Sequence, residues 1–340
     1  MREVALNLSR TSNCLIQQRR ALEKLGRAQE AAGAFGRLAT VEPDGDDSGE
    51  WDYKGLALQK LGRAAEAVAA HNRALEIDSA TADTWFHKGD ALRALGCYAE
   101  ALTVYEQGLS IDSHCANALY KKGLVLHALG RLAEALAAHD AALEVEPNHE
   151  DACHGRARIL EALHRPEEAL ASYDRVIAIN PEDVKALQNK AALLRTLGQY
   201  EDAERVLEGA LSADPENAIS LALKGVTMYC QERTREALDS FDDALAIKSN
   251  VAPYWWGRGA ALLKLGRVDG ALEAFSRARA INPRHPLLRL LQDAAVEDFL
   301  QAHAEFDVEM AVRAFDAAIR NAPASLWTQD STYGTEPPGR

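Results

Sequence analysis

One alanine recurs at a fixed interval of 34 residues through most of the chain. It occupies Ala67, Ala101, Ala135, Ala169, Ala203, Ala237 and Ala271, with less regular copies at Ala31 and Ala311. A repeat of this length is typical of stacked helical pairs, in which each pair packs only on its neighbours. The interval therefore predicts an all-α array and argues against a single globular core, which would be unusually large at 340 residues.

Other positions of the repeat predict how its first helix packs and where it ends. The fourth position is bulky, the eighth small and the eleventh aliphatic, as in Trp85, Gly89 and Leu92. Residues at this spacing share one face of a helix, and the small residue allows a second helix to approach closely. A Leu-Gly pair, as in Leu95 and Gly96, then ends the helix, because glycine adopts the left-handed cap conformation at little cost.

The whole pattern resembles the tetratricopeptide repeat family over residues 12–325. It reads Trp-x-x-x-Gly-x-x-Leu, Leu-Gly, Glu-Ala, Tyr or Phe, Ala and Pro in order along each repeat. The resemblance implies an α-solenoid of about nine stacked helix-turn-helix repeats that form a right-handed superhelix. In this family the concave face, lined mainly by the first helix of each repeat, holds a peptide or an extended segment of a partner protein.

The spacing also predicts the organisation of the chain. We expect an N-terminal extension (1–11), a divergent first repeat (12–45), seven regular repeats (48–285), a divergent C-terminal repeat or capping helices (286–325) and a disordered tail (326–340). Divergent end repeats are typical of solenoid caps. The tail is polar and contains proline, which favours disorder.

The seventh position departs from the family, because a cation stands where an apolar residue is usual. These residues are Lys54, Lys88, Lys122, Arg156, Lys190, Lys224 and Arg258. We expect their stems to pack across the helix pair while their charged groups meet carboxylates of the second helices, with Asp140, Asp174 and Asp242 as partners. The alternative is that the cations recruit an acidic partner protein.

Family geometry predicts which side chains of the first helices face the groove. The candidates are Phe86, His87, Asp90, Tyr120, Lys121, Arg158, Lys185, Gln188, Asn189, Tyr229 and Trp256. An extended peptide with a carboxylate portion and a hydrophobic end matches their order, through charge-assisted hydrogen bonds and aromatic anchors. The alternative is that these residues are solvated or pack on one another. Chaperone-binding members hold a C-terminal carboxylate with lysines and asparagines, and only Lys185 fits that clamp here.

Charge and composition narrow the class of partner. The net charge of −13 disfavours nucleic acid, because an acidic surface repels phosphate groups. No apolar run approaches the roughly 18 residues of a membrane span, and the N-terminus lacks a secretion signal. The five cysteines are scattered along the chain without a Cys-x-x-Cys pair. These features favour a cytoplasmic protein without a disulfide framework.

Motifs of common enzymes are missing from the sequence. It contains no phosphate-binding loop, no Gly-x-Ser-x-Gly and no His-Glu-x-x-His. We therefore expect no catalytic residue and no cofactor. His71 and His139 replace the usual aromatic residue of the second helix, and we expect each to be packed, with one satisfied ring nitrogen, rather than catalytic.

One group of residues could be considered for a metal site. It consists of His114, Cys115, His149, Cys153 and His154, which lie near neighbouring loops between repeats. Cys115 and His149 occupy equivalent positions in adjacent repeats, about 9 Å apart, which is far for a shared ion. We therefore expect ordinary loop and groove residues and no metal.

These patterns favour a non-enzymatic scaffold that binds a segment of another protein in its groove. One alternative is a regulatory or substrate-presenting subunit of a separate enzyme, such as a glycosyltransferase or kinase. Another is self-association through the divergent end repeats.

Overall fold

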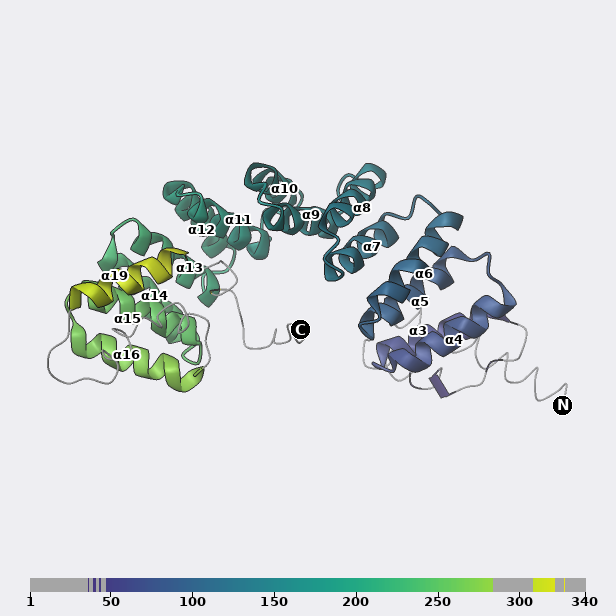
Figure 1. Ribbon diagram of the computed structural model, residues 1–340, viewed down its shortest axis with the longest axis horizontal. Coiled ribbons are helices and arrows are strands. Elements are labelled where there is room, and N and C mark those ends of the chain that lie inside the picture. The colour runs from purple at the N-terminus through teal and green to yellow at the C-terminus, as the bar shows by residue number, and fades with distance from the viewer. Residues whose placement is uncertain are drawn as a thin grey trace. The chain divides into compact units, whose positions relative to one another are not determined.

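The computed structural model describes residues 47–283 and 308–321, together with Gly36, Ala39, Thr40, Pro43 and Trp327. The predicted extension (1–11), most of the predicted first repeat (12–45), residues 286–307 and all of the predicted tail except Trp327 lie outside the described residues. The regular structure in the described part of the chain is helical, without a strand (Figure 1). The all-α prediction is confirmed.

The chain forms two compact units, Met1–Arg165 and Pro166–Arg340. The N-terminal unit contains α3 (Ser48–Lys60), α4 (Ala64–Ile77), α5 (Ala82–Ala94), α6 (Tyr98–Ile111), α7 (Ala116–Ala128), α8 (Leu132–Val145) and α9 (Glu150–Ala162). Helices α3 and α4, α5 and α6, and α7 and α8 pack as pairs, and α4, α6 and α8 each pack on the first helix of the next pair.

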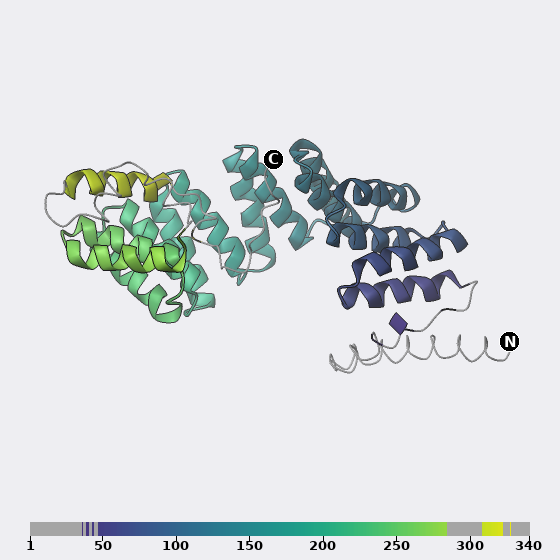
Figure 2. The ribbon, with the colours of Figure 1, turned by 60° about the horizontal axis from the view of Figure 1, so that its bottom comes forward.

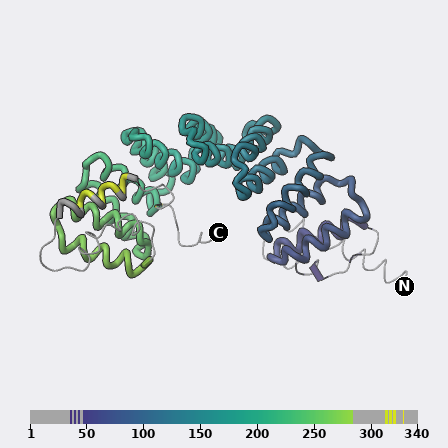
Figure 3. Tube along the Cα trace, in the orientation of Figure 1, coloured from purple at the N-terminus to yellow at the C-terminus, as the bar shows by residue number. Residues whose placement is uncertain are grey.

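The C-terminal unit repeats this arrangement. It contains α10 (Pro166–Ile179), α11 (Val184–Thr196), α12 (Tyr200–Ala213), α13 (Ala218–Cys230), α14 (Thr234–Ile247), α15 (Ala252–Lys264), α16 (Val268–Ile281) and α19 (Val308–Asn321). The tube in Figure 3 follows the chain through the same succession of helices, coloured by residue number. Helices α11 and α12, α13 and α14, and α15 and α16 pack as pairs.

The recurring alanine marks the closest packing within each repeat. All seven copies from Ala67 to Ala271 are fully buried. Because protein interiors are close-packed, a larger side chain at this position would force the neighbouring helices apart. The period of the sequence is therefore the period of the helix packing.

The turn after five of the seven first helices from α3 to α15 follows the predicted glycine cap. Gly62 adopts a φ of 74°, and the Arg63 amide donates a hydrogen bond to the Leu58 carbonyl at 2.9 Å. Two repeats place another residue at the equivalent position, His164 with a φ of 56° and Glu232 with a φ of 64°. A side chain at positive φ is strained, so these two departures need a compensating role.

Successive first helices also contact one another. In the N-terminal unit α3 packs on α5, α5 on α7 and α7 on α9, and in the C-terminal unit α11 packs on α13 and α13 on α15. Side chains at equivalent repeat positions therefore come together on one surface. We call this surface the first-helix face of each unit.

Helix α19 lies on the first-helix face of the C-terminal unit, against α13 and α15 (Figure 2). Its Phe315 ring stacks on Phe275 of α16 with the centroids 4.2 Å apart. The predicted divergent repeat or capping helices (286–325) include α19. Its Phe315 ring also lies 6.1 Å from Trp256 of α15, so α19 packs on a first helix and on the second helix that follows it.

Candidate functional site

Most of the predicted groove residues in the N-terminal unit reach the surface of its first-helix face. His87 and Asp90 on α5 and Tyr120 and Lys121 on α7 are half-buried, and Arg158 on α9 is exposed. Phe86 differs, because it is buried with its ring against Gly108 of α6. The structure thus places Phe86 in the packing between α5 and α6 rather than in a groove.

Asp52 on α3 joins His87 of this face to the buried His71 of α4. His71 donates from Nδ1 to one carboxylate oxygen at 2.8 Å, and His87 Nδ1 lies 3.0 Å from the other. Burial raises the pKa of Asp52, but the hydrogen bonds to His71 and His87 outweigh burial and lower the pKa to about 2. The carboxylate therefore stays ionised at neutral pH.

Gln59 orients the buried histidine in this group. Its amide nitrogen donates to the His87 backbone carbonyl at 2.6 Å and lies 3.0 Å from Nε2 of His71. Because that amide nitrogen is a donor, His71 accepts at Nε2 and donates at Nδ1 to Asp52. Both ring nitrogens of His71 are thus satisfied, whereas the sequence predicted one.

Asp90 forms the second polar group of the face. The buried Tyr105 hydroxyl donates to one oxygen of Asp90 at 2.7 Å, and the Lys121 ammonium donates to the other at 2.6 Å. Burial raises the pKa of the Tyr105 phenol well above its usual value, and the Asp90 charge raises it further. The two predicted groove residues Asp90 and Lys121 therefore orient each other.

Tyr120 lies over a third group, which contains His139. The Tyr120 ring is 5.7 Å from the His139 ring and 5.3 Å from the His149 ring. His139 is fully buried, and neither ring nitrogen has a hydrogen-bond partner in the described part of the chain. Burial lowers its pKa to about 4, and nearby His127 contributes to the shift.

Two glycines make the space for His139. A Cβ atom at Gly123 or at Gly155 would come within 2.6 Å of the imidazole. The corresponding ring in the C-terminal unit, Phe241, lies between Gly225 and Gly257 in the same way. His139 therefore occupies a site built for an aromatic ring.

Arg158 supplies positive charge beside these rings. Burial lowers the pKa of His127, and the charge of Arg158 lowers it further. The same charge acts on the Tyr120 phenol. Lys121 is already paired with Asp90, whereas Arg158 is exposed, so its guanidinium is able to donate hydrogen bonds to an anionic group.

Four of the seven cations at the seventh position contact a carboxylate of the preceding second helix, as predicted. Arg156 pairs with Asp140 at 2.7 Å, Arg258 with Asp242 at 2.6 Å, Lys122 with Glu106 at 3.1 Å, and Lys190 with Asp174. Lys54 and Lys88 instead lie over the Trp51 and Trp85 rings. The named partners Asp140, Asp174 and Asp242 are confirmed.

In the C-terminal unit, α11 presents the amide-rich part of the predicted groove. Lys185 is exposed and Asn189 is half-buried. Gln188 is buried and donates to the Asn217 side chain at 2.7 Å and to the Ser220 hydroxyl at 2.9 Å. Gln188 thus links α11 to the start of α13 through buried hydrogen bonds.

The predicted aromatic anchors of the C-terminal unit are buried under the chain itself. Trp256 is 1% exposed, and its ring packs on Phe275 at 5.1 Å and on Phe315 of α19 at 6.1 Å. Tyr229 is fully buried, with the Lys264 ammonium 4.7 Å above its ring. Both residues lie on the predicted face, but α19 covers it. The signal in the sequence is the apolar spacing of residues 312, 315 and 319.

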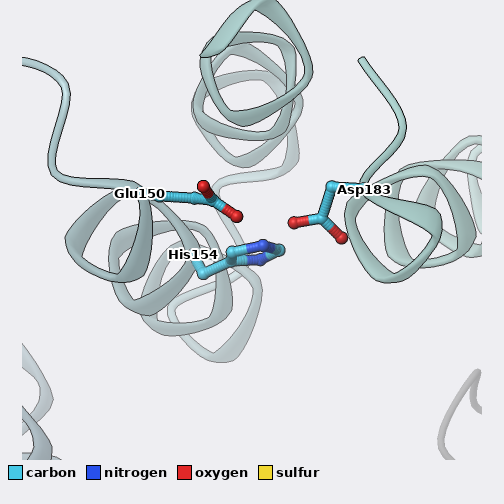
Figure 4. Close-up of side chains that lie close together, drawn as sticks. All are labelled: Glu150, His154 and Asp183. Carbon is cyan, nitrogen blue, oxygen red and sulfur yellow. The ribbon is translucent and has the colours of Figure 1, made fainter. Parts of the chain in front are cut away.

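Two of the residues considered for a metal, His149 and Cys153, are part of the structure of α9. His149 caps α9 by accepting a hydrogen bond from the Ala152 amide at 3.2 Å, and Cys153 is buried. Figure 4 draws Glu150 and His154, one turn apart on α9, and Asp183. Asp183 belongs to the C-terminal unit, where it caps α11 by accepting from the Ala186 amide at 2.9 Å. We assign no metal site to residues of separate units.

The two units are thus built from antiparallel helix pairs of an α-solenoid. A family model described as TPR repeat matches residues 89–130. Three models described as Tetratricopeptide repeat match residues 54–81, 126–194 with 160–226, and 252–285. The chain belongs to the tetratricopeptide repeat family.

Solved structures show the same fold at low sequence identity. The C-terminal part of a TPR repeat-containing protein from Cytophaga hutchinsonii is 14% identical, with a TM-score of 0.60 over 73% of this chain and 98% of that one. A tetratricopeptide repeat protein from Parabacteroides merdae is 19% identical, with a TM-score of 0.56 over 75% and 97%. PilF from Pseudomonas aeruginosa is 20% identical, with a TM-score of 0.52 over 61% and 94%.

One further comparison and one property of the helices complete the description. None of the curated proteins compared with this chain matches it. Among the described helices, none is both long enough and apolar enough to cross a membrane.

Proposed function

We propose that this chain is a non-enzymatic protein-interaction scaffold whose N-terminal unit binds an extended segment of a partner protein on its first-helix face. The observation that carries the proposal is the gathering of half-buried polar and aromatic side chains from successive first helices. His87, Asp90, Tyr120 and Lys121 are held in place yet remain partly open to solvent. The membership of the chain in a family of protein-interaction repeats supports this reading.

The chemistry of the face suggests the kind of segment. The Arg158 guanidinium can donate two parallel hydrogen bonds to a carboxylate, and the Tyr120 ring offers a rigid surface for an apolar side chain. Asp90 and Lys121 present an acceptor and a donor for backbone groups. A segment with an acidic residue next to an apolar residue fits this arrangement best. Lys185 and Asn189 on α11 offer a further polar contact within the C-terminal unit.

A peptide library tests the proposal without a known partner. Random peptides displayed on phage are selected on the full chain, and the affinities of the selected peptides are then measured for Arg158→Glu. Loss of a charge-assisted hydrogen bond across an interface costs about 2 kcal/mol or more, so binding should weaken by at least about tenfold. The selected peptides should be enriched in Asp or Glu.

A matched variant separates groove binding from general charge. Arg73 is also an exposed arginine of the N-terminal unit, but it lies on the second helix α4, where it pairs with Glu76. Arg73→Glu should leave peptide affinity unchanged, with the helical circular dichroism of both variants intact. Peptides that bind both variants equally well would contradict the assignment of the first-helix face.

A further inference from the structure

Helix α19 and Trp327 cover the first-helix face of the C-terminal unit in the way a bound ligand would. We propose that this segment is a releasable ligand held in cis, and that a helix with the same anchor residues supplied in trans takes its place. The inference concerns a different surface from the proposed peptide site of the N-terminal unit, and it stands or falls independently of that site.

The apolar contacts of the segment come from one side of α19. Phe315 and Ile319 are buried and Val312 is partly buried, whereas Arg313 and Ala317 are exposed. Residues at this spacing form one face of an amphipathic helix. Trp327 adds a second contact, with its ring 6.1 Å from Phe241 of α14. Anchors spaced in this manner are typical of helices that bind in apolar grooves.

Polar contacts fix the end of α19 on α13. The Arg320 guanidinium donates to the Cys230 carbonyl at 3.0 Å, to Asp316 at 2.7 Å and to Glu232. Lys264 of α15 pairs with the same two carboxylates, at 3.3 Å from Asp316. The buried Arg195 of α11 donates to the Arg320 carbonyl at 3.4 Å, and a cation there favours the C-terminal end of a helix.

Glu232 shows that the repeat itself is adapted to hold this segment. Five of the seven first helices between α3 and α15 are followed by glycine at positive φ, where Glu232 has a φ of 64°. Glutamate is strained in that conformation. Its carboxylate forms ion pairs with both Arg320 and Lys264. The departure from glycine therefore lies at the contact between α13 and α19, which gives the strained residue a role.

The fit of the segment is nevertheless incomplete, which makes it replaceable. The Tyr229 hydroxyl and the indole nitrogens of Trp256 and Trp327 are buried without a hydrogen-bond partner in the described part of the chain. Each of these groups loses its hydrogen bonds to water when α19 docks, and this loss opposes docking. A helix in trans that carries the anchors and also an acceptor for these donors would bind better.

Cysteine labelling provides a direct readout of release. Cys230, at the end of α13, and Cys153 of the N-terminal unit are both buried cysteines outside a disulfide. Burial raises the pKa of the Cys230 thiol, and Asp316 and Arg320 of α19 act on it electrostatically. Release of α19 should therefore speed the alkylation of Cys230, and Cys153 serves as the reference within the same molecule.

The test uses the full chain and two ways of loosening α19. In Phe315→Ala, which removes the main apolar anchor, alkylation of Cys230 should rise by at least about tenfold relative to Cys153. Glu232→Gly restores the residue that most repeats carry, so it removes the polar contact without straining the turn, and alkylation should rise about threefold. Ala317→Ser on the exposed side of α19 and His164→Gly at the equivalent turn should leave the rate unchanged.

A synthetic peptide of residues 306–328 then tests replacement in trans. Added to the Phe315→Ala or Glu232→Gly chain, it should restore the slow alkylation of Cys230, and a peptide with Phe315→Ala should not. The proposal is overturned if Cys230 and Cys153 accelerate equally in Glu232→Gly, or if Cys230 stays slow in both variants. It is also overturned if the peptide restores no protection while the circular dichroism of the chain remains native.

Discussion

The first-helix faces of the two units use the same repeat positions for opposite purposes. At the twelfth position, the N-terminal unit carries Gln59 and His127, which are half-buried polar residues. The C-terminal unit carries Arg195 and Tyr229, which are buried. The position in the repeat determines the direction of a side chain. Its exposure to solvent depends on whether another segment covers the face. In the C-terminal unit α19 covers it.

Trp256 and Tyr120 occupy the same repeat position in the two units and give the largest expected difference. Trp256→Ala removes a ring packed among Phe275 and Phe315, and should lower the free energy of unfolding by about 3–5 kcal/mol. Tyr120 is half-buried, so Tyr120→Ala should cost about half as much. Urea unfolding followed by circular dichroism measures both. Equal losses would mean that the two faces are equally open.

His139 gives the N-terminal unit a sensitivity to acid. Its pKa of about 4 in the folded chain lies below the ordinary value of 6.5. The unfolded chain therefore binds the proton first, and stability falls as the pH drops from about 6.5 to 4, by about 3 kcal/mol in total. His139→Phe, which copies Phe241 between its two glycines, should remove this dependence.

Unfolding between pH 7.5 and 4.5 measures this effect, and His71→Phe is the contrasting variant. His71 is as buried as His139 but donates to Asp52 and accepts from Gln59. Its replacement should destabilise the chain at neutral pH, because Asp52 loses a hydrogen bond. If His139→Phe leaves the slope of stability against pH unchanged, the buried neutral state of His139 is refuted.

Two buried tyrosines should respond to the same substitution with opposite signs. The Tyr105 hydroxyl donates to Asp90, so Tyr105→Phe should destabilise the chain by about 1–2 kcal/mol. The Tyr229 hydroxyl has no partner among the described residues, so Tyr229→Phe should be neutral or stabilising by up to about 1 kcal/mol. Thermal unfolding compares the two. A lower melting temperature for both would show that Tyr229 does find an acceptor.

The cation ladder, which is the set of repeated cations at the seventh position, should contribute least to the free energy of unfolding. Arg156 pairs with Asp140 at the surface, and such pairs contribute roughly 0–1 kcal/mol. Arg156→Met keeps the packed stem and removes the charge, so stability should change by less than about 1 kcal/mol and the residual effect should vanish in high salt. A salt-independent loss of several kcal/mol would assign the ladder a larger structural role.

Much of the fold could be predicted because its determinants are local and repeated. The alanine interval, the Leu-Gly caps and the partners of the cation ladder depend on residues within one repeat or its neighbour. The candidate site was harder to predict from the sequence. The accessibility of Tyr229 and Trp256 depends on α19, which lies about 50 to 90 residues away in the sequence. The sequence predicts a disordered tail that includes Trp327, but in the structure Trp327 is buried against Phe241.

Residues that depart from the repeat pattern indicate a contact that the pattern alone does not predict. Glu232 at a glycine position and the apolar spacing of Phe315 and Ile319 both mark the contact of α19 with the face. The pair of Asp52 and His71 could not be predicted from the pattern, because no other repeat carries aspartate and histidine at these two positions. Repeat position gives the direction of a side chain, but not the identity of its partner.

Hydroxyl-radical footprinting of the wild-type chain is the most direct test of an open face in one unit and a closed face in the other. His87 and Tyr120 should be oxidised readily, whereas Tyr229 and Trp256 should be protected to the level of the buried Tyr105 and Tyr173. Oxidation of Tyr229 and Trp256 at the rate of Tyr120 would contradict the account, because α19 would then leave the C-terminal face open.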